Sequence, residues 1–152
     1  MINKPLSTLE THLGYWLRMV SNAVSHSFGR KVEAEGVTVA EWVLLRMLYD
    51  VDRSAPSLLA DHMGMTRGAI SKLAERLLEK GLIERAPSAE DKRAHTLALT
   101  SGGRGLVPRL AALADANDLA FFGGLTAGER QQLEHLLRKI ASERSLIDMP
   151  VD

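Results

Sequence analysis

The sequence predicts a mainly α-helical fold that carries one small β-hairpin. Over most of the chain, apolar residues recur at intervals of three and four, which is the spacing of one helix face. After Gly81 the pattern changes, and two short runs of strand-forming residues flank a polar loop. A length of 152 residues with 45% hydrophobic and 25% charged residues fits a single domain with its own core.

The N-terminal part of the chain predicts one long helix within residues 6–35. Its apolar positions fall on one stripe, which consists of Leu9, Leu13, Trp16, Leu17, Val20, Val24, Phe28 and Val32. This stripe has more apolar surface than a small domain can cover. We therefore expect part of it to bind a second copy of the chain, and a monomeric helical cap is the alternative.

The next helix has a clear start signal. Thr38 is an N-cap residue and Glu41 follows three positions later, which together form a capping box. Apolar residues continue to Leu48, and a polar loop over residues 50–54 follows. Pro56 suits the first turn of another helix. We interpret the helix that begins after Thr38 as a scaffold between the N-terminal helix and the segments that follow.

Residues 66–81 predict a helix with two different faces. One face is apolar and should point into a core: Ile70, Leu73, Ala74 and Leu77. The opposite face is polar or small, which suits close approach to a DNA groove: Arg67, Gly68, Ser71, Lys72, Glu75 and Arg76. Thr66 is a natural N-cap and Gly81 a natural residue beyond the C-cap. Taken alone, the segment is also compatible with an ordinary amphipathic surface helix.

A strand, a polar loop and a second strand follow, over residues 82–86, 87–94 and 95–99. The loop is longer than a tight hairpin needs and carries Asp91, Lys92 and Arg93. Two helices and a charged hairpin in this order are typical of a winged helix-turn-helix. An arginine on such a wing is attracted to a narrow minor groove. We expect the Asp91 carboxylate to pair with the Arg93 guanidinium and fix its direction, whereas a solvated charged turn is the alternative.

The remaining chain predicts two further helices within residues 101–148. The first ends before Gly123 and Gly124, and Thr126 with Glu129 forms a capping box for the second. Glycines at positions 102, 103 and 105 predict a ragged start of the first helix, because each costs about 1 kcal/mol relative to alanine. Pro108 indicates either the first turn of that helix or a kink in it. Apolar residues at 133, 136, 137 and 140 again favour a partner subunit.

Three motifs in order resemble the MarR family of bacterial transcriptional regulators: Leu-Glu-Lys-Gly-Leu-Ile-Glu-Arg at 78–85, Asp-Lys-Arg at 91–93 and Leu-Thr at 99–100. The resemblance covers nearly the whole chain. It implies one domain over 1–152, with a winged helix-turn-helix over 37–100 and dimerisation helices over 6–35 and 101–148. It also implies a homodimer that binds a pseudo-palindromic operator in double-stranded DNA, usually as a repressor released by a small ligand. The residues expected to bind DNA are Thr66, Arg67, Gly68, Ser71, Lys72, Arg76, Asp91, Lys92 and Arg93.

The same resemblance places a ligand between the dimerisation helices and the winged part. The candidates are Tyr15, Trp16 and Met19 on the first helix with Trp42 and Arg46 on the second. Aromatic walls and one cation suit a planar, anionic aromatic effector such as a salicylate-like acid. In the alternative interpretation, both tryptophans belong to the core and Arg46 is a solvated helix residue.

Composition limits the other classes of function. The formal net charge of zero predicts modest nonspecific affinity for DNA, so operator binding should rely on two copies. The absence of cysteine excludes disulfides and thiol-based switches. Five histidines leave a metal-responsive regulator as an alternative, but their spacing is not that of a metal site, so we expect neither metal nor cofactor.

An enzyme is not expected, because neither Ser71 nor Ser101 has identifiable histidine and carboxylate partners. A dimeric interaction module that has lost DNA binding is a further alternative. Such a module has no need for the cations on the helix after Thr66 or for Arg93. The chain shows neither a long apolar run nor a signal peptide, so we expect a cytoplasmic protein without a membrane partner.

Overall fold

The computed structural model describes residues 4–91 and 93–151, so Lys92 lies outside the described residues. A 3-10 turn, Leu9–Thr11, precedes α1 (Leu13–Ala34), α2 (Val39–Tyr49), α3 (Pro56–Met63) and α4 (Arg67–Glu79). The hairpin of β1 (Ile83–Pro87) and β2 (His95–Leu99) follows, and then α5 (Ser101–Phe122) and α6 (Ala127–Glu143). The predicted mainly α-helical fold with one small hairpin is confirmed.

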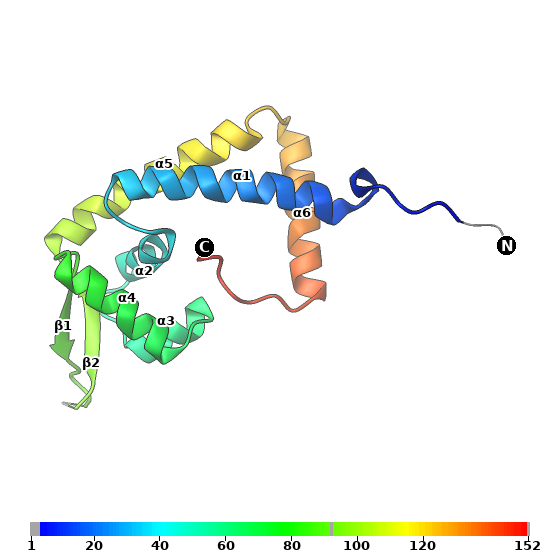
Figure 1. The fold of residues 1–152 in the computed structure, drawn as a ribbon. Coiled ribbons are helices and arrows are strands. Elements are labelled where there is room, and N and C mark those ends of the chain that lie inside the picture. The colour runs from blue at the N-terminus through cyan, green and yellow to red at the C-terminus, as the bar shows by residue number, and fades with distance from the viewer. Residues whose placement is uncertain (1–3, 92, 152) are drawn as a thin grey trace.

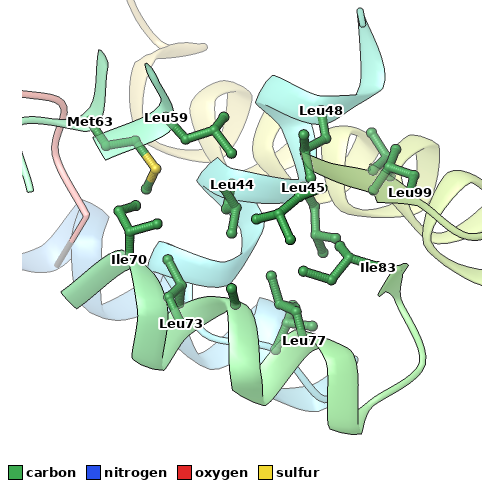
Figure 2. Close-up of a cluster of buried hydrophobic side chains, with 14 of the residues drawn as sticks. Leu44, Leu45, Leu48, Leu59, Met63, Ile70, Leu73, Leu77, Ile83 and Leu99 are labelled. Atoms are coloured by element: carbon green, nitrogen blue, oxygen red, sulfur yellow. The ribbon is translucent and has the colours of Figure 1, made fainter. Parts of the chain in front are cut away.

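The long helices and the winged part lie on different sides of the molecule. Figure 1 shows α1 and α5 running alongside each other above α2, with α3, α4 and the hairpin below it. The core fills the space between α2 and the elements α3, α4 and the hairpin, and Figure 2 shows the side chains of α2 facing those of α3 and α4. Its labelled members are Leu44, Leu45, Leu48, Leu59, Met63, Ile70, Leu73, Leu77, Ile83 and Leu99.

The hairpin is antiparallel and is attached to the loop between α2 and α3. Its register pairs Ile83 with Leu99 and Pro87 with His95. Ser54 forms an isolated bridge to Leu97. The Ser54 N–H donates to the Leu97 carbonyl with an N···O distance of 2.9 Å, and the Leu97 N–H donates to the Ser54 carbonyl with an N···O distance of 2.8 Å. This bridge fixes the base of the wing to the α2–α3 loop, and no local sequence pattern predicts it.

The start of α5 is sharp, whereas the sequence predicted a ragged one. The Thr100 hydroxyl accepts from the Gly103 N–H at 3.1 Å and donates to the Gly81 carbonyl at 2.7 Å. Gly103 is buried, and an added Cβ would overlap the Leu82 carbonyl oxygen and lie 3.0 Å from its carbon. Glycine stands there because the backbones of α5 and the segment after α4 touch. Pro108 lies inside α5, so the first-turn alternative is wrong.

The outer ends of the helical part keep much of their apolar surface exposed. Leu13 on α1 is 87% exposed and Ile140 on α6 is 53% exposed.

The predicted capping box at the start of α6 is confirmed. The backbone N–H of Thr126 has the largest effect in lowering the pKa of the Glu129 carboxyl, and the Thr126 side chain lowers it further. None of the described helices combines the length and the apolar character needed to cross a bilayer.

Candidate nucleic-acid interface

The two faces of α4 lie as the sequence predicted. The apolar residues Ile70, Leu73, Ala74 and Leu77 are buried, with at most 4% of any side chain exposed. The residues of the opposite face are all exposed: Arg67, Gly68, Ser71, Lys72, Glu75 and Arg76. Thr66 caps the helix by accepting from the Ala69 N–H at 3.1 Å. The N-terminal end of α4 is exposed, and its first backbone N–H groups have no partner within the helix. Together with the nearby cations, these N–H groups suit an anionic partner.

The cations of this segment fall into two sets. Lys80 and Arg85 are used inside the protein, because Lys80 Nζ lies 2.7 Å from Glu41 and Arg85 Nη2 lies 2.9 Å from Glu75. In the part of the chain that the structure describes, no ion pair holds the side chains of the second set: Arg67, Lys72, Arg76 and Arg93. Cations without an ion-pair partner among the described residues thus gather on the exposed face of α4 and on the wing, although the chain is neutral overall, and phosphate binding depends on such a local arrangement of charge.

The wing loop differs from the expectation in one contact. Asp91 Oδ1 accepts from the backbone N–H of Arg93 at 2.9 Å, and the Asp91 carbonyl accepts from the Ala94 N–H at 3.0 Å. The expected pair of the Asp91 carboxylate with the Arg93 guanidinium is wrong for the described residues. In a turn, an aspartate reaches the backbone two residues ahead more readily than the end of a long side chain. Asp91 therefore shapes the loop, and the Arg93 side chain projects into solvent.

Sequence reasoning missed two residues that position this surface. Arg53 Nε donates to Thr96 Oγ1 on β2 at 2.7 Å, so an exposed cation lies beside the wing. Glu41 is 1% exposed, and Lys80 at the end of α4 donates to both of its carboxylate oxygens. The capping box at Thr38 identified Glu41 as a cap only. No signal in the sequence pairs it with a lysine 39 positions away.

An open cavity of about 380 Å³ lies between α1, α2 and α5, and two residues of the C-terminal segment form part of its lining. Its lining is mostly apolar and consists of Val24, Ser25, Phe28, Val39, Trp42, Val43, Ala114, Asn117, Asp118, Met149 and Pro150. Of the five predicted ligand residues, only Trp42 is in this lining. Trp16 donates from Nε1 to the Glu10 carbonyl and packs edge-on against Tyr15. Met19 is half-exposed, and Arg46 pairs with Asp50 at 2.7 Å.

Asn117 is the buried polar residue of the cavity lining, which also contains Ser25 and Asp118. The residue is 3% exposed, and its Oδ1 accepts from Ser27 at 2.8 Å and from Lys31 at 3.0 Å. Its Nδ2 donates one hydrogen to the Val24 carbonyl at 3.2 Å, which leaves the second N–H for another acceptor. Asp118 is paired with Arg130, and no cationic side chain is among the described lining residues. The arrangement suits a flat apolar molecule that offers one acceptor oxygen.

Within residues 4–91 and 93–151, no three His, Cys, Asp or Glu residues lie close enough together to hold an ion.

The short α3, the capped α4 with its exposed polar face and the charged hairpin define a winged helix-turn-helix protein. Residues 35–94 match the model of the MarR family. A protein of Thauera aromatica that is assigned to regulation of the hcr operon is 31% identical over 134 residues, which cover 88% of this chain and 81% of the relative. This chain belongs to the MarR family of transcriptional regulators.

Solved structures support the same assignment. A mutant of MarR from Escherichia coli complexed with operator DNA gives a TM-score of 0.75 at 27% identity, over 84% of this chain and 92% of that one. BpsR from Bordetella bronchiseptica, whose DNA binding is regulated by 6-hydroxynicotinic acid, gives a TM-score of 0.77 at 25% identity, over 91% of this chain and 98% of that one. The likeness therefore extends beyond the winged part to the long helices.

Proposed function

We propose that this protein represses transcription by binding a pseudo-palindromic operator as a homodimer, with α4 in the major groove and the wing at the adjacent minor groove. The observation that carries the proposal is a set of cations on the exposed face of α4 and on the wing that no ion pair within residues 4–91 and 93–151 holds, namely Arg67, Lys72, Arg76 and Arg93. Operator DNA in the related E. coli structure supports it. In this role the protein binds DNA and catalyses no reaction, and it acts in the cytoplasm, where chromosomal DNA lies.

The dimer is proposed from the apolar surface that one chain leaves uncovered. On α1, Leu13 and Leu17 are 87% and 54% exposed, and on α6, Leu136 and Ile140 are 47% and 53% exposed. Figure 1 shows the N-terminal half of α1 and α6 reaching beyond the winged part. Apolar faces on both ends of one chain can interleave with those of a second copy, as in large obligate interfaces.

Selection of bound fragments from a random DNA pool tests the operator and the dimer together. We expect an enriched inverted repeat whose half-sites have centres about 10 bp apart, because a two-fold dimer presents its α4 helices one helical turn apart. The mass of the free protein is measured by light scattering in the same buffer. A monomer that enriches no sequence at low salt would contradict the proposal.

Arg93→Ala should weaken operator binding roughly tenfold and to a similar degree on different operator sequences, since a guanidinium in the minor groove reads shape rather than base identity. Arg109→Ala is the matched control, because Arg109 is an exposed cation on α5 and its loss changes the net charge by the same amount. Fluorescence anisotropy with labelled operators at fixed salt measures both. Equal losses of operator affinity for Arg93→Ala and Arg109→Ala would show that binding depends on net charge and not on the position of Arg93.

Substitutions on α4 should act differently from Arg93→Ala. Ser71→Ala and Arg67→Ala remove side chains proposed to contact base edges, and such contacts discriminate between bases by about 1–3 kcal/mol. We expect the preferred operator to change when the pool selection is repeated with each variant. Equal losses of affinity on operator and on random DNA would contradict base reading by α4.

A small aromatic effector is proposed to bind the cavity and release the operator. Salicylate and its uncharged counterpart salicylamide should both lower the bound fraction, and salicylamide at the lower concentration because no cation is among the described lining residues. Trp42→Ala should abolish the response, whereas Trp16→Phe changes a tryptophan outside the lining. A bound fraction that neither compound changes would contradict this part of the proposal.

A further inference from the structure

The segment after α6 turns back toward the centre of the molecule. Ser145 has a φ of 53°, the one positive value among the described residues other than glycine. The Leu146 N–H donates to the Ala141 carbonyl at 2.9 Å, which closes the turn. Figure 1 shows the segment running from the end of α6 to a point beside α2. Residues 146–151, which we call the C-terminal tail, thus lie against parts of the chain that are distant in sequence.

The tail contacts both the cavity and the turn between α3 and α4. Met149 and Pro150 belong to the lining of the cavity that also contains Trp42, and Val151 packs against the core. Asp148 lies against Gly64, the left-handed residue that ends α3, so closely that an added Cβ there would be 2.7 Å from Asp148 Cγ. Gly64 is two residues before Thr66, the N-cap of α4.

Apolar contacts hold the tail in place. No hydrogen bond or ion pair joins residues 147–151 to the rest of the described chain. Met149 is 38% exposed and Ile147 is 85% exposed, so the buried area is small. A segment held in this way opens at low free-energy cost compared with the core.

We propose that the C-terminal tail is the movable wall of the effector cavity, with Met149 and Pro150 as ligand-contacting residues that limit it to small, flat, uncharged aromatic molecules. A larger ligand must displace the tail and thereby withdraw Asp148 from the turn between α3 and α4. Binding of a ligand that displaces the tail is then coupled to the turn that precedes α4. This inference rests on the proposed function only in treating the cavity as the effector site.

Fluorescence of Trp42 tests the position of the tail without DNA or ligand. The chain has two tryptophans, so the full-length Trp16→Phe protein reports from Trp42 alone. In that background, removal of residues 147–152 should raise the acrylamide quenching constant about twofold or more and shift the emission to longer wavelength, because the cavity that Trp42 lines then loses the part of its wall made by Met149 and Pro150. Unchanged quenching and emission would overturn the proposal.

Single substitutions keep the test independent of the truncation. Met149→Ala should increase quenching, whereas Ile147→Ala, on an exposed residue of the same tail, should not. Gly64→Asn should move the Asp148 side chain without removing the wall, so it should increase quenching less than the truncation does, since asparagine tolerates the left-handed backbone and its Cβ meets only side-chain atoms of Asp148. Equal quenching by Met149→Ala and Ile147→Ala would contradict a wall made by Met149.

The ligand range gives the second readout. Wild type should bind salicylamide more tightly than the bulkier 3-hydroxy-2-naphthamide, and the truncated protein should lose this preference and bind the larger amide several-fold more tightly than wild type does. An unaltered preference would overturn the role of the tail in selecting ligands. If the tail results hold but neither amide releases the operator, the proposed effector response fails while the wall stands.

Discussion

Gly103→Ala is expected to destabilise the protein by about 2–3 kcal/mol, although alanine is normally favoured over glycine within a helix. The added Cβ would overlap the Leu82 carbonyl oxygen and lie 3.2 Å from Leu99 Cδ2. The obstacle is backbone rather than the end of a flexible side chain, so α5 itself must move. That movement would also strain the hydrogen bonds of Thr100 to Gly81 and Leu82.

Gly105→Ala is the matched control for this prediction. Gly105 lies on the same helix, and no described atom outside its own helical neighbourhood is within 4 Å of an added Cβ. Its replacement should therefore raise stability by up to about 1 kcal/mol through helix propensity and a less flexible unfolded chain. Urea unfolding followed by circular dichroism measures both variants. A Gly103→Ala protein as stable as Gly105→Ala would show that the contact with Leu82 is not restrictive.

The contrast between these glycines illustrates what the sequence can predict. The sequence predicted the capping boxes at Thr38 and Thr126 and the two faces of α4. Each of these features depends on residues within one or two turns of one another. Helix propensity treats Gly103 and Gly105 alike. Only the packing of α5 on Leu82, a residue 21 positions earlier, distinguishes them.

For the same reason, the sequence predicted the positions of the α4 residues better than those of the ligand residues. The exposed face of α4 follows from its helical period, so its polar residues lie where they were expected. The ligand residues depended on where other elements pack against the long α1. The cavity uses Val24 and Phe28, about two and three turns beyond Trp16, because α2 and α5 pack against that part of α1. The contribution of Met149 depends on the path of the chain after α6, which no local pattern specifies.

The ion pair of Glu41 with Lys80 joins three elements that together hold α4. Lys80 Nζ donates to the Gly36 carbonyl at 2.9 Å and to the two Glu41 oxygens at 3.0 and 2.7 Å, which uses all three of its hydrogens. Glu41 Oε1 also accepts from the Thr38 N–H. The pair therefore connects the end of α1, the start of α2 and the end of α4, and so fixes α4 relative to the helices of the proposed dimer.

Lys80→Met should lower the free energy of unfolding by about 2–3 kcal/mol, because it leaves the Glu41 carboxylate buried without its cation. The Lys80 side chain is 38% exposed, so water can replace part of the lost contact and the cost stays below that of a fully buried pair. Arg85→Met is the matched control. It breaks the Arg85–Glu75 pair, whose side chains are 40% and 57% exposed, and should cost less than about 1 kcal/mol.

A double-mutant cycle separates the ion pair from the loss of the lysine stem. Glu41→Gln keeps an acceptor for the Thr38 N–H but removes the buried charge, so Lys80→Met should cost far less in the Glu41→Gln background than in the wild type. Operator affinity, measured where every variant is folded, should fall for Lys80→Met because the two α4 helices of a dimer then lose their fixed separation. Equal costs of Lys80→Met in both backgrounds would mean that the buried carboxylate does not need its lysine.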